Sequence, residues 1–555
     1  MAIAAEHDES ESSGPHGGAE LALPPADTEI ELKLTATPEA LAALRESDLI
    51  ASRALGPPET RSLESAYYDT PDRRLQQRGA GLRVRRAGGG FVQTLKAEDD
   101  DNAALFGRGE WEAPVASFEP DLAALSAEPA RALLDDIDPD ALAPVFATRI
   151  ERTTRPVAVP RTHGAGNGGS EAEVECAFDT GAVEAGGRSV AVSEVELELT
   201  RGAPAALYRF AAELHALAPL RVETLSKAAR GHLLAAGAVP PYRKAVALDL
   251  DGDATAGEVL DAILRGCFRH CLANQATALD GRDPEGVHQM RVALRRLRSA
   301  LAAFRPLLGG DRVDWLAAET RWLAAALGPA RDWDVFLAEL VAPVAEALPD
   351  RTELAVLRRA AEAERARGYA QAREAIESGR ATTLLLALGE WIEGAGWRDG
   401  GDTDALAHPA TEVAGRLLDR RHRKAMKSGR GFARLGADQR HEVRIQLKKV
   451  RYLTEFFLSL YSGRRGRAYL NALTGLQKGL GRLNDVAVAE RLLATVVADQ
   501  AAAAIDAGNG TDALCFGAGI VVGWHRRGVQ ELEPRLRDDW DAFAEARPFW
   551  TGPGR

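Results

Sequence analysis

Long uncharged apolar stretches are missing from this chain, and cysteine is scarce. No segment approaches the roughly eighteen apolar residues that a membrane-spanning helix needs, so we expect no membrane span and no membrane partner. Four cysteines among 555 residues are too few for a disulfide framework, which favours a reducing cytoplasm. The sequence also has neither a Walker-type glycine loop nor a paired Cys/His zinc set, which argues against P-loop enzymes and zinc domains.

Excess positive charge is lacking as well. A formal net charge of −12 argues against a simple nucleic-acid binder but is compatible with a local basic patch. Residues 1–26 are acidic, small and polar, without the apolar middle of a signal peptide, so we expect a disordered tail. A chain of 555 residues is too long for one ordinary core, which predicts about two to four domains.

Charged residues alternate with apolar ones along many short segments between residues 27 and 235. The first is "EIELK", in which Glu29, Glu31 and Lys33 share one face of a predicted strand. Such segments at short intervals predict an antiparallel sheet or barrel with flanking helices. The same alternation recurs at Arg83, Arg85, Thr94, Lys96, Arg108, Glu110, Glu112, Glu173, Glu175, Asp179, Glu194, Glu196 and Glu198. One such strand is usually a solvated outer face, but so many together favour a closed barrel with a charged interior.

A charged barrel interior needs a ligand or mixed signs, because an unpaired buried charge costs several kcal/mol. Arginine can donate two parallel hydrogen bonds to phosphate oxygens, and clustered carboxylates are suitable ligands for Mg²⁺ or Mn²⁺. Both kinds of side chain occur together on these strands. The pattern therefore indicates a metal–phosphate complex and a phosphoryl-transfer or nucleotidyl-transfer reaction.

Residues 27–235 resemble the CYTH domains, or triphosphate tunnel metalloenzymes. "EIELK" matches their ExExK signature, and "YYDTPDRRLQQRGAGLRVRR", "TLK", "RGEWE", "FDTG", "VSEVELEL" and "LSKAARG" follow in the family's order. The resemblance implies an eight-stranded antiparallel tunnel that binds triphosphate with Mg²⁺ or Mn²⁺.

The resemblance also implies site residues. The implied metal ligands are Glu29, Glu31, Glu110, Glu112, Asp179, Glu194, Glu196 and Glu198. The implied triphosphate-binding residues are Arg83, Arg85, Arg108, Arg149 and Lys227, and the implied catalytic residues are Glu29, Glu31, Lys33 and Lys96. In "ATRIERTTR", Arg152 competes with Arg149 for the place in the tunnel, and the sequence leaves that choice open.

After a linker at residues 236–252, the spacing of apolar residues becomes typical of helices over residues 253–548. "HEVRIQLKKVR" from His441 lies 153 positions after "HQMRVALRRLR" from His288 (441 − 288), and "LGRLND" follows "LGPARD" at the same offset. Two matches in register predict a duplicated helical unit with halves at about 253–398 and 405–548. We therefore expect an all-α second domain.

Each copy carries a basic stripe, because positions 0, 3, 7 and 10 lie on one face of a helix over about 15 Å. The stripes consist of His288, Arg291, Arg295 and Arg298, and of His441, Arg444, Lys448 and Arg451. Residues 408–451 hold 13 Lys or Arg and four Asp or Glu, a local charge of +9. A solvated basic face is the simpler interpretation, but matched copies favour a site for a polyanion.

The helical half resembles the CHAD domain, a family of duplicated helical bundles that is associated with inorganic polyphosphate. The resemblances together imply a cytoplasmic inorganic triphosphatase that binds tripolyphosphate and longer polyphosphate, with polyphosphate granules as a candidate location. Thiamine triphosphate, nucleoside triphosphates and cyclisation of ATP stay open as alternatives, as does a non-catalytic polyphosphate adaptor. Nucleic acid is a weaker alternative because the basic stretches lack interleaved aromatic residues. The oligomeric state does not follow from the sequence.

Overall fold

The structure is a computed structural model that describes residues 30–103, 106–160, 170–461, 463–507 and 512–551. The predicted tail at residues 1–26 and the predicted site residue Glu29 lie outside this range. The side chain of Arg108 is likewise not among those described.

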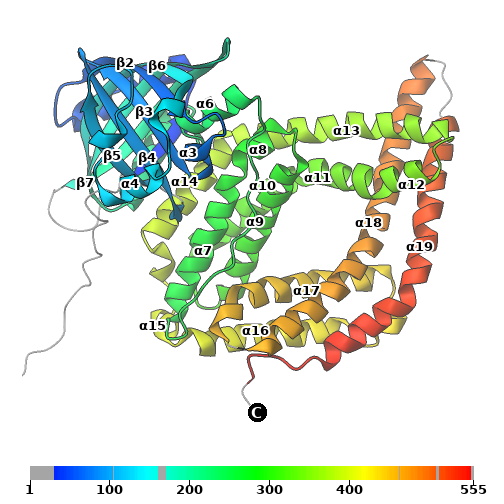
Figure 1. The fold of residues 1–555 in the computed structure, drawn as a ribbon. Coiled ribbons are helices and arrows are strands. Elements are labelled where there is room, and N and C mark those ends of the chain that lie inside the picture. The colour runs from blue at the N-terminus through cyan, green and yellow to red at the C-terminus, as the bar shows by residue number, and fades with distance from the viewer. Residues whose placement is uncertain (1–29, 104–105, 161–169, 462, 508–511, 552–555) are drawn as a thin grey trace, which may run out of the picture.

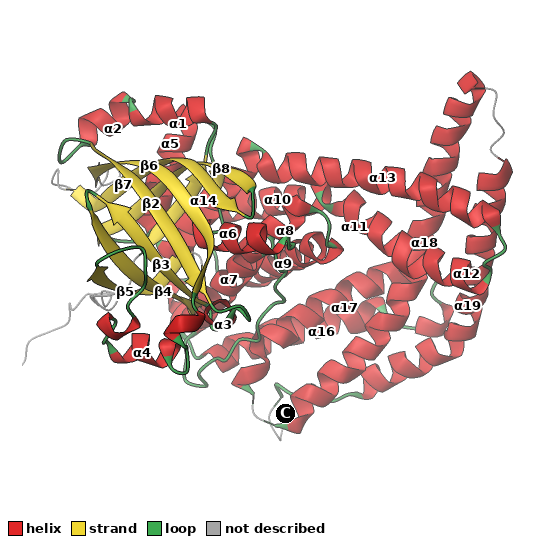
Figure 2. Cartoon of the chain, turned by 45° about the horizontal axis from the view of Figure 1, so that its top comes forward, coloured by secondary structure: helices red, strands yellow, loops and turns green. Residues whose placement is uncertain are grey.

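An antiparallel barrel forms the first half of the chain (Figures 1 and 2). Its described strands are β1 (Glu31–Thr35), β2 (Glu59–Asp69), β3 (Ala80–Ala87), β4 (Gly90–Ala103), β5 (Phe106–Val115), β6 (Ala143–Pro160), β7 (Ser170–Ala185), β8 (Arg188–Gly202) and β9 (Arg221–Val222). They are ordered β5-β4-β3-β2-β6-β7-β8-β1-β9, and β5 also pairs with β1 to close the sheet. The predicted antiparallel fold is confirmed, although nine strands are described where eight were expected, because the two-residue β9 is added beside β1.

The leucines and valines that alternate with the charges point outward, where helices cover them. Leu32 and Leu34 of β1 and Leu197 of β8 belong to the same core as α1 (Pro38–Arg45), α2 (Asp48–Arg53) and α5 (Ala205–Leu217). On the opposite side, Leu82 and Leu95 pack with α3 (Arg74–Gln77) and α4 (Glu128–Leu134). Because strand side chains alternate between faces, covering the apolar face from outside directs the charged face inward.

Helices form the whole of the second half, as predicted (Figure 1). The longer helices are α7 (Ala256–Ala273), α9 (Pro284–Phe304), α10 (Asp311–Ala326), α13 (Thr352–Glu377), α14 (Gly379–Glu393), α16 (Ala410–Ser428), α17 (Ala437–Phe457), α18 (Arg464–Ala507) and α19 (Asp512–Glu545). The shorter ones include α8 (Gln275–Asp280), α11 (Gly328–Val335), α12 (Ala342–Ala347) and α15 (Thr403–Ala407). Among the described residues, no helix has an apolar stretch long enough to cross a bilayer. The duplication itself stays a prediction.

The two halves share one hydrophobic core. Helix α5 covers the barrel on one side and packs against α14 of the helical half on the other. Tyr208 of α5 is 1% exposed and lies against Gly389 of α14, where an added Cβ would come within 2.2 Å of the ring. This close approach means that the barrel and the helices are packed together rather than joined only by a linker.

Candidate functional site: a charged barrel interior and a basic helical cluster

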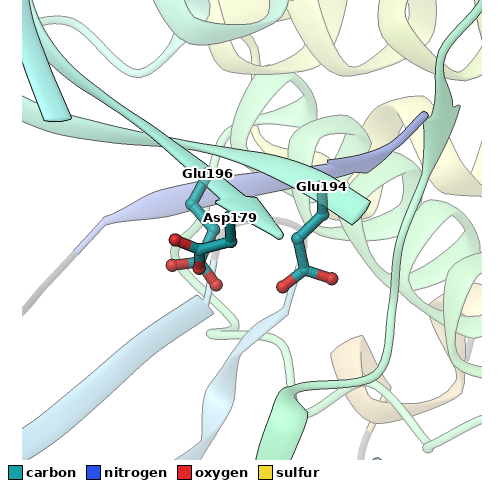
Figure 3. A group of neighbouring side chains, drawn as sticks. All are labelled: Asp179, Glu194 and Glu196. Atoms are coloured by element: carbon teal, nitrogen blue, oxygen red, sulfur yellow. The ribbon is translucent and has the colours of Figure 1, made fainter. Parts of the chain in front are cut away.

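Three buried carboxylates converge inside the barrel (Figure 3). Asp179 of β7 and Glu194 of β8 are paired directly across the two strands, and Glu196 lies two residues further along β8. Their exposed fractions are 0%, 0% and 9%, and one oxygen of each lies within 4.8 Å of the others. The alternation in "SEVELEL" places Glu194 and Glu196 on one face of the sheet, and the register of β7 against β8 adds Asp179 to that face.

Cations surround these carboxylates. The Lys227 Nζ, at the start of α6 (Lys227–Ala236), lies 2.6 Å from Asp179 and 2.9 Å from Glu196, and it also contacts Glu194. Arg152 of β6 donates to Asp179 through Nε at 2.7 Å and Nη2 at 2.6 Å and also contacts Glu196. Burial opposes the charge of Lys227, but Glu196, Asp179 and Glu194 raise its pKa above the ordinary value. Burial acts to raise the pKa of Glu196, but Lys227, Lys33 and Arg152 hold it well below the ordinary value.

The first strand extends this cluster. Glu31 and Lys33 are 5% and 3% exposed, and the Lys33 Nζ contacts Glu31 and lies 3.5 Å from Glu196. Glu198 of β8 is paired with Glu31 in the strand register and is half-buried. The β1, β7 and β8 wall of the barrel is therefore rich in carboxylates.

The opposite wall, β3 to β5, is richer in cations. The Glu110 carboxylate lies 2.8 Å from the Lys96 Nζ and 3.4 Å from the Arg83 Nη2. Glu112 accepts from Thr94 at 2.9 Å, although 54% of its side chain is exposed. Arg85 donates from Nε to the neutral Ser65 hydroxyl at 3.1 Å, and burial together with Arg83 lowers the pKa of Arg85 to about 10. A buried guanidinium of this kind would be stabilised by an anion.

Apolar side chains fill the inner face beyond the charged section. Tyr67 stacks on Phe146 with ring centroids 4.4 Å apart, and both belong to a buried cluster with Leu63 and Ile150. Helix α6 packs on this cluster, and a Cβ added at Gly231 would lie 2.2 Å from the Phe146 ring. The charged section therefore ends at this apolar cluster, which lies beneath α6, the helix that carries Lys227.

A second cluster of cations lies between α9 and α17. The Nε atoms of Arg291, Arg295 and Arg444 and the Nδ1 atom of His288 are buried without a hydrogen-bond partner among the described residues. Burial and the neighbouring arginines lower the pKa of His288 to about 4, of Arg291 to about 10 and of Lys448 to about 7. Besides burial, the positive charge of Arg295 on α9 lowers the pKa of both Arg444 and Lys448 on α17, so the two stripes face a common space.

Not every residue of the two stripes joins this cluster. Arg451 donates to Glu455 at 2.7 Å, and His441 is exposed with its Nδ1 2.9 Å from the Asn484 side chain. Arg298 is half-buried, and burial and Arg321 lower its pKa. Asp332 of α11 lies among the arginines, and burial raises its pKa.

Two family models match the chain in succession. The CYTH domain matches residues 27–232, and the CHAD domain matches residues 262–494. The chain joins a CYTH domain to a CHAD domain.

Individual relatives are similar to parts of the chain. An inorganic triphosphatase of Haemophilus influenzae is 30% identical over 212 residues, which cover 37% of this chain and 54% of that protein. The chain therefore matches about half the length of this curated relative. The crystal structure of the CHAD domain from the plant Ricinus communis is 32% identical, with a TM-score of 0.47 over 55% of this chain and 98% of that one. PptA from Streptomyces chartreusis is 17% identical, with a TM-score of 0.39 over 52% of this chain and 100% of that one.

Arg149 does not lie inside the CYTH barrel, and its assignment as a phosphate-binding residue is corrected. Its side chain is 58% exposed, contacts Glu184 and lies 3.7 Å from Glu64 on the outer surface. Arg152 takes the interior position because residues three apart on a strand point to opposite faces. The pairing of Arg152 with Asp179 in the strand register decides which of the two faces inward.

Sequence reasoning missed three other interior residues of the CYTH domain. Arg230 reaches Glu194 from the next turn of α6 after Lys227, a spacing visible in "KAAR". Ser65 and Tyr67 share a face of β2, which the alternation in "SAYYD" indicates. Burial acts to raise the pKa of Tyr67, but Arg83 and Arg85 lower it by more. Ser65 and Tyr67 are neutral and gave no charge signal in the sequence, whereas Arg230 gave one in "KAAR".

Proposed function

We propose that the CYTH domain hydrolyses a short inorganic polyphosphate, such as tripolyphosphate, with Mg²⁺ or Mn²⁺. The observation that carries this proposal is one barrel interior with buried carboxylates on one wall and the buried cations Arg83 and Arg85 on the other. The activity of the H. influenzae relative supports the reaction type.

The carboxylate cluster fits a divalent cation. Asp179, Glu194 and Glu196 offer hard oxygen donors close enough to share one ion, which suits Mg²⁺ or Mn²⁺. A bound divalent ion would supply charge neutralisation for the phosphate chain and polarise a P–O bond. The Lys227 ammonium now contacts all three carboxylates, so it would shift away or share them when the ion binds.

The protein's own groups have separate roles in the proposed reaction. Arg83, Arg85 and Lys96 bind and orient the phosphate oxygens. Lys33 stabilises the negative charge of the bound polyphosphate near β1. Water attacks the terminal phosphorus, the bridging P–O bond breaks, and the products are orthophosphate and pyrophosphate. Glu31 takes the proton of the attacking water, and its contact with Lys33 holds it on the interior face of β1.

Phosphate release by the purified full chain tests this proposal. The panel is tripolyphosphate, long-chain polyphosphate, ATP and thiamine triphosphate, each with Mg²⁺ and with Mn²⁺. We expect fastest release from tripolyphosphate, strong loss in Glu31→Gln, and no loss in Glu151→Gln, whose side chain is exposed. Equally slow release by wild type and Glu31→Gln would favour the non-catalytic adaptor, and preference for an organic triphosphate would assign one of the other tunnel activities.

We also propose that the CHAD domain binds longer polyphosphate in the cluster of His288, Arg291, Arg295, Arg444 and Lys448. The Nε atoms of Arg291, Arg295 and Arg444 are buried without a hydrogen-bond partner among the described residues, and this observation carries the proposal, because a polyanion would stabilise such donors. Competition between polyphosphate and duplex DNA at matched salt tests it, and stronger DNA binding would contradict it. All four cysteines are free thiols, which supports a cytoplasmic location, where polyphosphate granules would provide the long chains.

A further inference from the structure

Two buried side chains of the CHAD domain donate hydrogen bonds to the backbone around β9 of the CYTH domain. Thr382 of α14 donates from Oγ1 to the Leu220 carbonyl at 2.8 Å, and Gln275 of α8 donates from Nε2 to the Val222 carbonyl at 2.7 Å. Both side chains are 1% exposed, so water does not compete for these bonds. The described CHAD helices therefore take part directly in the edge of the barrel.

The strand held in this way is paired with the strand that carries Glu31 and Lys33. Val222 is paired with Leu34 of β1 in antiparallel register, and the Glu223 backbone N–H donates to the Lys33 carbonyl at 2.9 Å. A two-residue strand makes few ladder bonds of its own. Its position consequently depends on the donors on its other side.

Local hydrogen bonds order the short segment of chain between β9 and Lys227. The Glu223 carboxylate accepts from the backbone N–H groups of Thr224 at 2.8 Å and Leu225 at 2.9 Å. The Ser226 hydroxyl then caps α6 by accepting from the Ala229 N–H at 3.1 Å, and Lys227 is the first residue of that helix. Displacement of β9 would therefore move the ammonium that contacts the carboxylate cluster.

We propose that Gln275 and Thr382 are positioning residues for the barrel site, so that the CHAD domain holds Lys33 and Lys227 in place independently of any polyphosphate. This inference rests on the proposed triphosphatase activity for its functional consequence. The two residues act only through β9, β1 and the start of α6. The CHAD domain would then be a structural part of the active site as well as a binding module.

Substitutions in the full chain that remove the donors but keep the side-chain volume test the proposal. Thr382→Val and Gln275→Met remove the two donors, whereas Thr382→Ser keeps a hydroxyl. Matched controls are Thr320→Val and Gln446→Met, since Thr320 bonds the Leu316 carbonyl of its own helix and Gln446 bonds Glu442. Both control residues are also buried in the CHAD domain, at 0% and 2% exposure.

The readouts are kcat and KM for tripolyphosphate and backbone amide exchange over residues 220–230. For Thr382→Val and Gln275→Met we expect kcat/KM to fall roughly twofold to tenfold, the effect of one buried hydrogen bond, and exchange in the segment to accelerate. Thr382→Ser should stay within about twofold of wild type, and the controls should change neither readout beyond any general loss of stability.

The outcomes separate this inference from the proposed function. Unchanged exchange in both variants, or faster exchange without loss of turnover in an active wild type, would overturn the positioning role. If wild type releases no phosphate, the proposed triphosphatase function fails. The exchange measurement would then still decide whether Gln275 and Thr382 hold the segment.

Discussion

The barrel interior and the basic helical cluster both collect cations, but they compensate the charge differently. In the barrel, Lys227 and Arg152 lie against buried carboxylates, which raise the pKa of both groups above the ordinary values despite burial. Between α9 and α17, burial and neighbouring arginines lower the pKa of Arg291 and Lys448 instead. The first arrangement suits a ligand that brings both positive and negative charge, such as a metal–phosphate complex, and the second suits a polyanion.

The largest effect is expected when the positive charge that balances the buried carboxylates of the barrel is removed. Lys227→Met leaves Asp179, Glu194 and Glu196 without their shared ammonium, and breaking a buried ion pair costs about 3–5 kcal/mol. We expect a lower melting temperature that Mn²⁺ restores, measured by calorimetry with and without the ion. Lys244→Met, which removes an exposed lysine of the linker, is the control. A melting temperature that Mn²⁺ does not raise would contradict the carboxylate cluster as a cation site.

Substitution of the proposed proton acceptor should impair hydrolysis in the barrel without affecting polyphosphate binding by the helical cluster. Glu31→Gln is expected to lower kcat for tripolyphosphate by about 100-fold or more, the usual effect of removing a general base. Long-chain polyphosphate binding, followed by titration calorimetry, should stay within about twofold of wild type, because the altered group is remote from α9 and α17. Joint loss of turnover and binding would mean one composite site instead of two.

The converse substitutions act on the helical cluster. His288→Ala and Arg291→Ala should each weaken long-chain polyphosphate binding, by about tenfold to a hundredfold for the arginine, because a charge-assisted contact contributes about 1.5–3 kcal/mol. Tripolyphosphate turnover should be nearly unchanged. Arg358→Ala serves as the matched control, since Arg358 is 67% exposed and pairs with Glu362 on α13. An equal loss of affinity in the control would point to a diffuse electrostatic effect.

The smallest effect is a pH dependence of binding. Burial and Arg444 lower the pKa of Lys448 to about 7, so the free amine is protonated below that pH and neutral above it. A bound polyanion favours the protonated form, so binding takes up a proton and affinity falls as pH rises through 7. From pH 6 to 8 we expect a decrease in affinity of about fivefold beyond that of Lys448→Met, at constant salt. Parallel pH profiles for the two proteins would show that Lys448 does not titrate in this way.

Alternation and periodicity predicted most of the architecture. The charged segments from "EIELK" to "SEVELEL" indicated a closed antiparallel barrel, which β1 to β8 confirm, and helical periodicity indicated the all-α second half. The boundaries at 27–235, 236–252 and 253–548 stay predictions. The matched families, at 27–232 and 262–494, cover the same two parts of the chain.

Other features depended on packing between distant segments. The sequence established that Arg149 and Arg152 face opposite sides of a strand, but only the pairing of Arg152 with Asp179 showed which side is interior. Likewise, a stripe such as His441 to Arg451 specifies a helix face, but whether each side chain is already paired depends on neighbours such as Asn484 and Glu455.

The sequence by itself determined which residues share a face, because backbone geometry repeats every two residues in a strand and every 3.6 in a helix. The tertiary structure alone decided which carboxylates meet Lys227, which arginines of α9 and α17 lie close together, and that Gln275 and Thr382 of one domain bond the edge of the other. These are contacts between residues far apart in the chain, and no local pattern specifies the distance or the burial on which their energies depend.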